Sequence, residues 1–302
     1  MRLITKLLIT LSFVVPLFAE TPDWCKALPR PAYAKLERIH VSDTWFEVYR
    51  VRPGVVAIYE PRQAEEVISY LITGTNRAIL FDTGMGISDI EAVVKQLTTL
   101  PIMVLNSHTH NDHVGDNWRF ATVYGMPTDF TRANAKGSKA DAQAELAPGQ
   151  VCGSLPSGFD PKAYSTKRFR ISHWLRDGEM MDLGGRRLRV IATPGHTPDA
   201  ISLLDEQNGL LFTGDTFYAG PIYLYRPETD LDAYVASVKK MAAIAPKLKL
   251  LLPAHNEPVA DPAVLARVVE AMQQVRWGKV ASIPKDGKRE YVFEGFSFLM
   301  AR

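Results

Sequence analysis

Short apolar runs, separated by turn-forming residues, dominate the chain between residues 45 and 82. Each run has the length of a β-strand and is rich in β-branched or aromatic side chains, and Pro-Gly, Pro-Arg or Gly-Thr-Asn breaks stand between the runs. The pattern therefore predicts an antiparallel meander of four strands: WFEVYRV (45–51), GVVAIYE (54–60), EVISYLIT (66–73) and RAILFD (77–82).

Strands and helices alternate in the rest of the chain. The first helix is marked by apolar residues at helical spacing: Ile87, Ile90, Val93, Val94 and Leu97. Later helices are predicted at 231–245 and 261–277, and later strands at IMVLN (102–106), RRLRVIATPG (186–195), AISLLDE (200–206), GLLFTGD (209–215), KLKLLLPAH (247–255) and REYVFEGFSFLMAR (289–302). This order, in two comparable halves, predicts an α/β (α+β) protein built as a sandwich of two mixed β-sheets covered by helices.

One stretch, residues 131–165, departs from this pattern because it is rich in Ala, Gly, Ser and Pro. It is predicted to be a helix and a loop inserted between the two halves. An insertion of this length in a compact domain is more often functional than a plain connection. A flap over a functional site is therefore favoured, and a surface excursion without a role is the alternative.

The N-terminus has the layout of a secretory signal peptide. Arg2 and Lys6 precede the apolar run LLITLSFVVPLF, and Ala19 suits the last position before a cleavage site. The run is shorter than the roughly 20 residues that a membrane-spanning helix needs. Residues 1–19 are therefore predicted to be removed, which leaves residues 20–302 as a single domain that is periplasmic or secreted. A buried N-terminal helix is the alternative.

Composition and charge narrow the classes of partner. The whole chain has a formal net charge of +2, and the loss of Arg2 and Lys6 would bring this charge to zero. Without a basic arm or an interleaved basic and aromatic stretch, nucleic acid is not an expected partner. A hydrophobic fraction of 46% supplies a core. These features predict a soluble globular protein that acts on a small-molecule substrate, with no membrane contact after signal cleavage.

The two cysteines, Cys25 and Cys152, lie far apart in the sequence, and neither belongs to a closely spaced pair of metal ligands. In an oxidising compartment two such cysteines can form a disulfide, whereas two buried free thiols are the alternative. The sequence leaves this choice open.

Histidine is unevenly distributed, with three of the seven histidines in the stretch NSHTHNDHVGD (106–116). This stretch directly follows a predicted strand, and three later predicted strands also end in a histidine or an aspartate. Side chains on loops at one edge of a scaffold can converge. His40 and His173 lie elsewhere in the pattern and are interpreted as structural. The candidates at strand ends are His108, His110, Asp112, His113, His196, Asp215 and His255.

Imidazole and carboxylate groups are the ligands that bind zinc and similar divalent ions. In a His-x-His sequence both side chains point the same way on an extended segment, and the adjacent Asp112 and His113 can turn toward a second ion. A single histidine of this kind is most often a hydrogen-bonded structural residue. Seven such side chains at strand ends favour a metal centre instead.

The ordered motifs resemble those of the metallo-β-lactamase superfamily. HTHNDH (108–113) is similar to its His-x-His-x-Asp-His signature. The other similar motifs are the aspartate turn ILFDTG (79–84), the Gly-His motif TPGHTPDAISL (193–203), the bridging-aspartate motif FTGD (212–215) and the last-histidine motif PAH (253–255). The resemblance spans about residues 45–260. It implies a four-layer αβ/βα sandwich with two zinc ions per chain at its rim.

The resemblance also implies a role for each ligand. One zinc ion would be bound by His108, His110 and His196, the other by Asp112, His113 and His255, and both by Asp215. Asp82 would hold the ligand loop through hydrogen bonds. Two metal ions that share a water lower its pKa, so hydrolysis is the expected reaction. Asp112 is therefore a candidate catalytic residue as well as a ligand.

The surroundings of the site separate the branches of the superfamily. A net charge near zero does not fit the nuclease branches, and the short stretch after His255 leaves no room for the helical domain of glyoxalase II. Asp215 stands where true β-lactamases of the superfamily usually have Cys or Ser. Tyr218 is similar to a tyrosine of the acyl-homoserine lactone lactonases whose hydroxyl helps bind the substrate carbonyl, and a tyrosine packed under the flap is the alternative. Three more residues are candidates to line the same pocket: Tyr223, Tyr225 and Arg226.

The leading hypothesis is a periplasmic zinc-dependent hydrolase in which a water shared by the metals opens a small ester, a lactone or a related cyclic acyl compound. The alternatives are a β-lactamase, an iron-dependent sulfur dioxygenase and a metal-binding module without catalysis.

Overall fold

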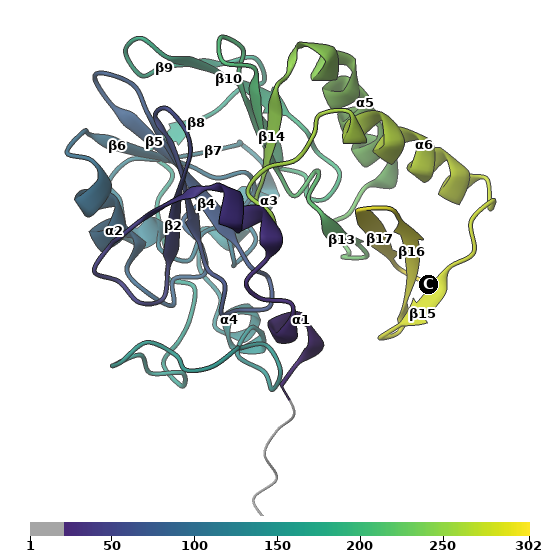
Figure 1. The fold of residues 1–302 in the computed structure, drawn as a ribbon, viewed down its shortest axis with the longest axis horizontal. Helices are drawn as coiled ribbons and strands as arrows, with labels where there is room; N and C mark the ends of the chain where they lie inside the picture. Colours follow the sequence, from purple (N-terminus) through teal and green to yellow (C-terminus); the bar gives the residue numbers. More distant parts are fainter. Residues whose placement is uncertain (1–20) are drawn as a thin grey trace, which may run out of the picture.

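The computed structural model describes residues 21–302 (Figure 1). The predicted signal peptide, residues 1–19, lies outside the described residues. The described part starts with a short helix, α1 (Asp23–Lys26), and its last strand is β17 (Phe296–Met300). Within this part of the chain, no helix has both the length and the apolar character that are needed to cross a membrane.

Eight strands form the first sheet, in sequence order: β1 (Glu37–Ile39), β2 (Glu47–Arg52), β3 (Val55–Tyr59), β4 (Ile68–Thr73), β5 (Ala78–Phe81), β6 (Ile102–Leu105), β7 (Val123–Gly125) and β8 (His173–Trp174). The predicted meander is confirmed, because β2 to β5 are successive antiparallel neighbours. β6 then pairs in parallel with β5, after the helix α2 (Ile90–Leu97). Asp89 caps this helix by accepting a hydrogen bond from the amide of Ala92.

Five strands form the second sheet: β9 (Met180–Asp182), β10 (Arg187–Ala192), β11 (Ile201–Asp205), β12 (Leu210–Gly214) and β14 (Leu250–Pro253). β9 to β12 are antiparallel neighbours, and β14 pairs in parallel with β12. The predicted helices between and after these strands are confirmed as α5 (Leu231–Ile244) and α6 (Val264–Arg276).

A third sheet of four strands completes the C-terminal half: β13 (Gly220–Leu224), β17, β16 (Lys288–Phe293) and β15 (Ile283–Lys285). The prediction of one strand over 289–302 is wrong, because Glu294 and Gly295 turn the chain back between β16 and β17. Apolar residues stand on both sides of this turn, so the hydrophobic pattern hides it.

Three buried cores separate the layers. Between the first two sheets, Tyr70 packs against Phe212, with ring centroids 5.3 Å apart. On the outer face of the first sheet lies α2, through Val93 and its neighbours. α5 and α6 pack against the outer face of the second sheet, with Tyr234 fully buried there. α2 therefore lies on the opposite side of the molecule from α5 and α6 (Figure 1). The predicted sandwich of mixed sheets covered by helices is confirmed, with one difference: the structure has a third sheet, which the prediction of two sheets did not include.

The segment 131–165 contains the end of α3 (Asp129–Asn134), α4 (Ala140–Ala144) and a long loop. Cys152 in this loop forms a disulfide with Cys25, which decides the question that the sequence left open. Near its other end, Tyr164 donates a hydrogen bond from its hydroxyl to the carbonyl oxygen of Met85 at 2.6 Å. The loop is therefore held against the first sheet and the N-terminal residues.

Candidate metal centre

The ligand loop, residues 106–116, starts directly after β6 and is held from several sides. The side chain of Asn106 and the amide of Thr83 both donate to the carbonyl oxygen of His113, each at 2.9 Å. Asp82, at the end of β5, accepts a hydrogen bond from the amide of Ser107 at 2.6 Å. Its second carboxylate oxygen lies 3.0 Å from His113 Nδ1. Asp82 thus ties the loop to β5, at the place where the resemblance put it.

Three later strand ends bring further candidates to this loop. His196 follows β10, Asp215 follows β12 and His255 follows β14. Their side chains meet those of His108, His110, Asp112 and His113, so every ligand named from the sequence lies in one cluster. His40 and His173 are not part of this cluster.

The ligand atoms form two neighbouring groups. In the first group, His110 Nδ1 lies 3.0 Å from His108 Nε2 and 3.1 Å from His196 Nε2. In the second group, His113 Nε2 lies 3.2 Å from Asp112 Oδ2 and 3.2 Å from His255 Nε2. These are the two ligand sets that the resemblance implies.

Asp215 lies between the two groups. Its Oδ2 is 3.6 Å from His196 Nε2, and its Oδ1 is 3.0 Å from His255 Nε2. The same carboxylate also approaches His113 Nε2, at 3.4 Å. One carboxylate therefore reaches ligands of both sets, as a bridging ligand must.

This donor set fits metal cations better than a purely hydrogen-bonded cluster. Asp215 Oδ1 is buried and, within residues 21–302, makes no hydrogen bond. Buried polar atoms rarely lack a partner. In addition, neutral imidazole nitrogens that face each other with lone pairs repel, unless a proton or a cation lies between them. The cluster therefore has the chemistry of a site for divalent cations.

Burial and neighbouring charges favour metal-binding protonation states of His108, His196 and Asp215. Burial lowers the pKa of His196 to about 4 and the pKa of His108 well below its usual range, so both rings are neutral at neutral pH. Burial alone would raise the pKa of Asp215, but the nearby His255 and His113 lower it to about 2. Neutral imidazoles and ionised carboxylates are the forms that bind metal ions.

His255 differs from His196 because a carboxylate faces it closely. Burial alone would lower the pKa of His255, but the charge of Asp215 and its hydrogen bond raise it to about 9. Without a cation nearby, this ring therefore holds a proton at neutral pH. A metal ion that binds here has to displace that proton.

The second nitrogen of each ring is also held in place. His255 Nδ1 donates to the carbonyl oxygen of Glu65 at 2.6 Å, and His196 Nδ1 donates to the carbonyl oxygen of Tyr223 at 2.8 Å. These bonds keep a proton on Nδ1, so Nε2 is the nitrogen that binds a metal: directly in His196, and in His255 once the metal has displaced the second proton.

Glu228 is a partner of the site that the sequence did not indicate. Its Oε1 lies 2.7 Å from His110 Nε2, which is the ring nitrogen that points away from the other ligands. Glu228 stands in an irregular segment between β13 and α5 and belongs to none of the motifs. Only the folded chain brings it next to His110.

Tyr218 is buried beside the second ligand group. Its ring packs against that of His255, with centroids 4.8 Å apart. Its hydroxyl donates to the carbonyl oxygen of Pro221 at 2.7 Å and accepts from the amide of Tyr223 at 3.3 Å. The hydroxyl therefore supports the start of β13 in this structure, and its contact with a substrate carbonyl stays a prediction.

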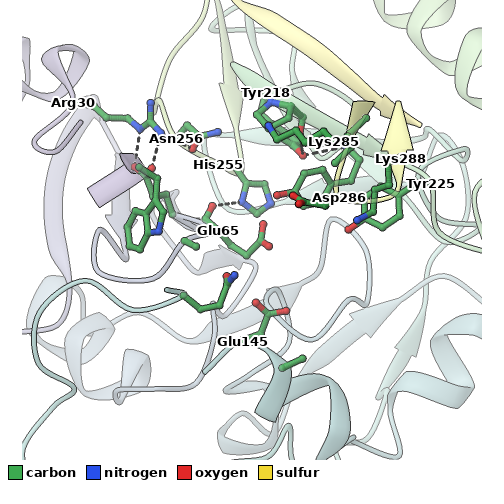
Figure 2. Close-up of a pocket in the computed structure, with 18 residues that line it drawn as sticks. Arg30, Glu65, Glu145, Tyr218, Tyr225, His255, Asn256, Lys285, Asp286 and Lys288 are labelled. Atoms are coloured by element: carbon green, nitrogen blue, oxygen red, sulfur yellow. Dashed lines mark hydrogen bonds and ion pairs between the residues drawn. The ribbon is translucent and has the colours of Figure 1, made fainter. Parts of the chain in front are cut away.

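A cavity of about 450 Å³ opens beside His255 (Figure 2). Tyr218, Tyr223 and Tyr225 all line it, as expected from the sequence. The expectation for Arg226 is wrong, because Arg226 lines a smaller cavity of about 190 Å³ with His110 and Glu228. Adjacent residues of the segment after β13 thus face different cavities.

The segment 131–165 reaches the larger cavity through Glu145. The side chain of Gln63 donates to Glu145 Oε2 at 3.1 Å, and that of Asn111 donates to Glu145 Oε1 at 3.3 Å. Asn111 directly precedes the ligand Asp112. The inserted segment is therefore connected to the ligand loop.

Comparison with known families agrees with this geometry. The family described as the metallo-beta-lactamase superfamily matches residues 64–255, which is more than half of the chain. The chain belongs to the metallo-β-lactamase superfamily. The matched residues include every candidate ligand of the cluster, from His108 to His255.

Several curated proteins are similar over most of the chain. The acyl-coenzyme A thioesterase MBLAC2 of Gallus gallus is 25% identical over 224 residues, which cover 70% of this chain and 80% of that relative. The same-named protein of Homo sapiens is 24% identical, over 62% of this chain and 71% of the relative. The lactamase-like protein aptB of Emericella nidulans is 28% identical, over 73% and 60%. These matches place the chain among the hydrolases of the superfamily.

Solved structures of the superfamily share the fold. A beta-lactamase domain protein from Burkholderia ambifaria has a TM-score of 0.53 and 22% identity, over 77% of this chain and 78% of that chain. A metallo-beta-lactamase family protein from Thermus thermophilus has a TM-score of 0.52 and 19% identity, over 81% and 80%. At these identities the likeness concerns the fold alone.

Proposed function

We propose that this chain is a zinc-dependent hydrolase with two zinc ions, which acts on small acyl compounds such as esters, thioesters and lactones. The observation that carries the proposal is the meeting of His196, Asp215 and His255 with the ligand loop. Within residues 21–302 the buried Oδ1 of Asp215 makes no hydrogen bond and faces only the ring nitrogens of His255 and His113, so this oxygen is available to a metal ion that those rings also bind. A donor set of His and Asp alone suits zinc.

The acyl class of substrate is supported by two observations. The relatives in Gallus gallus and Homo sapiens are named acyl-coenzyme A thioesterases. The cavity of about 450 Å³ beside His255 lies within the range of roughly 300–1,000 Å³ that is usual for small-molecule sites. Esters, thioesters and lactones all present an acyl carbonyl and differ only in the leaving group, so one site can serve all three.

Zinc ions bound here would supply an activated water and a Lewis acid for the acyl carbonyl. The chain supplies the positions: His108, His110 and His196 would hold one ion, Asp112, His113 and His255 the other, and Asp215 both. Asp82 and the carbonyl of Glu65 fix the rings of His113 and His255 in advance, so little rearrangement is needed on binding. The buried ring of Tyr218 shields one side of His255 from water.

The test of this proposal joins metal analysis to a hydrolysis screen. We expect about two zinc ions per chain and turnover of at least one ester, thioester or lactone. Asp215→Ala should lower both the zinc content and kcat/KM, the latter by at least about 100-fold. His173→Ala is the matched control, because His173 lies outside the cluster and contacts Glu179. Zinc-loaded protein that leaves all acyl substrates intact but cleaves β-lactams would contradict the proposal and favour a β-lactamase.

We further propose that the enzyme works outside the cytosol. The layout of residues 1–19 supports export, and the Cys25–Cys152 disulfide suits an oxidising compartment. In cells that express the full chain, we expect the mature protein to appear in the periplasmic or extracellular fraction after cell fractionation. Mass spectrometry of this fraction should show an N-terminus directly after Ala19. An uncut chain in the cytosol would overturn this part.

A further inference from the structure

The cavity beside His255 has a second end, formed by the turn between β15 and β16. His255 and Tyr218 line the ligand end, whereas Lys285, Asp286 and Lys288 line the turn end. In Figure 2 these turn residues lie with Tyr225 on one side of His255. The turn belongs to the third sheet, which neither the fold prediction nor the proposed reaction requires.

The turn holds two lysines on the same face of the hairpin. Lys285 and Lys288 are directly paired across it, so their side chains project to one side. Asp286 and Gly287, with φ of 47° and 76°, occupy the two left-handed positions of a tight two-residue turn, for which Asp-Gly is a favoured sequence. The backbone thus explains Asp286 without a ligand role. Like charges at directly opposed positions destabilise a hairpin, so each lysine is expected to have a partner that offsets this repulsion.

The two lysines differ in their partners. Lys285 forms an ion pair with Glu290 at 3.0 Å. The Lys288 ammonium lies 4.3 Å from the centre of the Tyr225 ring, and among residues 21–302 it has no carboxylate within ion-pair distance. A lysine held over an aromatic ring keeps its N–H donors available on the side away from the ring. Lys288 therefore presents an unneutralised cation at the turn end of the cavity.

The balance of charge differs between the two ends of the cavity. Glu65 and Glu145 line the ligand end, whereas the turn end has the two lysines, Lys285 and Lys288, and one acid, Asp286 (Figure 2). A molecule that fills the cavity of about 450 Å³ therefore meets the metal ligands with one part and the lysines with another. A negative charge on the part of the molecule that meets the lysines strengthens its binding, because charge-assisted hydrogen bonds from an ammonium are stronger than neutral ones.

We propose that Lys288, together with Lys285 and Tyr225, forms a subsite for an anionic group of the substrate, a carboxylate or a phosphate. The acyl carbonyl of the same substrate lies at the metal ligands. This inference rests on the proposed function and narrows it to acyl compounds that carry a negative charge at a distance from the carbonyl.

The test compares two esters that differ only in charge, with the zinc-loaded full chain as enzyme. One is the hexanoyl ester of 4-hydroxybenzoate, which is anionic, and the other is the hexanoyl ester of 4-hydroxybenzamide, which is neutral and nearly the same shape. We expect a KM about tenfold lower for the anionic ester, with similar kcat. Lys288→Gln raises the KM of the anionic ester about fivefold to tenfold and leaves the KM of the neutral ester unchanged. A third ester, 4-(hexanoyloxy)phenyl phosphate, distinguishes phosphate from carboxylate.

Lys279→Gln is the matched control. The ammonium of Lys279 lies 4.8 Å from the centre of the Trp277 ring, the same kind of contact as in Lys288, but neither residue lines the cavity. This variant should behave as the unchanged protein toward both esters. Thermal unfolding of both variants shows whether the loss of a lysine–aromatic contact has itself disturbed the chain.

Binding without turnover separates this inference from the proposed function. N-hexanoyl-4-aminobenzoate and N-hexanoyl-4-aminobenzamide, the amides that match the two esters, are titrated into the zinc-loaded protein by calorimetry. A preference for the anion that disappears in Lys288→Gln supports the subsite, even if no ester is hydrolysed and the proposed function fails. Hydrolysis of both esters with equal KM, an equal loss in Lys279→Gln, or no binding of either amide overturns the subsite. The first two of these results leave the proposed function standing.

Discussion

Asp82 adopts a left-handed backbone conformation, with φ of 68°, at the end of β5. Residues other than glycine adopt this conformation at a cost, and the surrounding structure has to hold them there. From this position the carboxylate reaches the amide of Ser107 and the ring of His113. The strained backbone thus aims one side chain at two points of the ligand loop.

Glu228 is a second single residue that positions a ligand, through Nε2 of His110. Glu228→Gln keeps the shape of the side chain but removes the negative charge that faces His110 Nε2 at 2.7 Å. We expect the zinc affinity to fall about tenfold, because contacts of this kind orient a metal-binding ring and raise its basicity. Competition with a chelator of known affinity measures this change.

The control for this prediction is Glu179→Gln. Glu179 contacts His173 at 2.8 Å in a similar manner, but His173 is not a ligand candidate. The zinc affinity of the Glu179→Gln variant should equal that of the unchanged protein. If Glu228→Gln also binds zinc as tightly as the unchanged protein, Glu228 has no positioning role.

Glycines at strand ends let the elements come close enough for the ligands to meet. Gly195 and Gly214 directly precede His196 and Asp215. A Cβ on Gly195 would lie 2.3 Å from the backbone of Tyr234 in α5, and a Cβ on Gly214 would lie 2.6 Å from the side chain of Ser107. The Gly-His and Gly-Asp motifs thus serve packing between elements, in addition to carrying a ligand.

Gly195→Ala should therefore destabilise the protein by more than about 2 kcal/mol, because backbone cannot yield as a flexible side chain can. Urea unfolding of the zinc-free protein measures this without the contribution of the metal. Gly278→Ala is the control, since Gly278 also has a positive φ but no atom of residues 21–302 lies within 4 Å of its Cβ position. We expect that control to cost about 1 kcal/mol, and equal costs in the two variants would contradict the close-approach argument.

At the scale of the whole molecule, the disulfide joins parts that the sheets do not connect. Cys25 stands near the start of the described chain, and Cys152 stands in the inserted segment that carries Glu145 to the cavity. The indole of Trp24 donates to the carbonyl oxygen of Gly149 at 2.9 Å beside it. This cross-link restricts the unfolded chain over a separation of 127 residues.

Replacement of both cysteines by alanine should lower the free energy of unfolding by about 2–4 kcal/mol. Zinc content should stay unchanged, because neither cysteine belongs to the ligand cluster. Urea unfolding with and without a reductant provides the measurement. The reductant should destabilise the unchanged protein and have no effect on the variant, and equal stability of all four samples would refute the role of the cross-link.

The sequence by itself determined the seven candidate ligands, the meander and the main helices. These features depend on local information: apolar period, turn-forming residues and the place of His and Asp directly after a strand. When the local pattern predicts where a strand ends, it also predicts that the residue after it lies at the edge of a sheet. For this reason the sequence could name residues as distant as His108 and His255 as members of one candidate group, and the structure brings their side chains together.

Only the tertiary structure decided the other features. Glu228 reaches His110, Arg226 faces a separate cavity, Cys25 pairs with Cys152, and the C-terminal residues form a hairpin with its lysines at the cavity. None of these contacts follows from the hydrophobic periodicity of a short segment. Each contact joins segments that are distant in sequence, and the packing of sheets, loops and helices decides whether they come close. Packing depends on the whole set of buried side chains, and no short stretch of the sequence contains it.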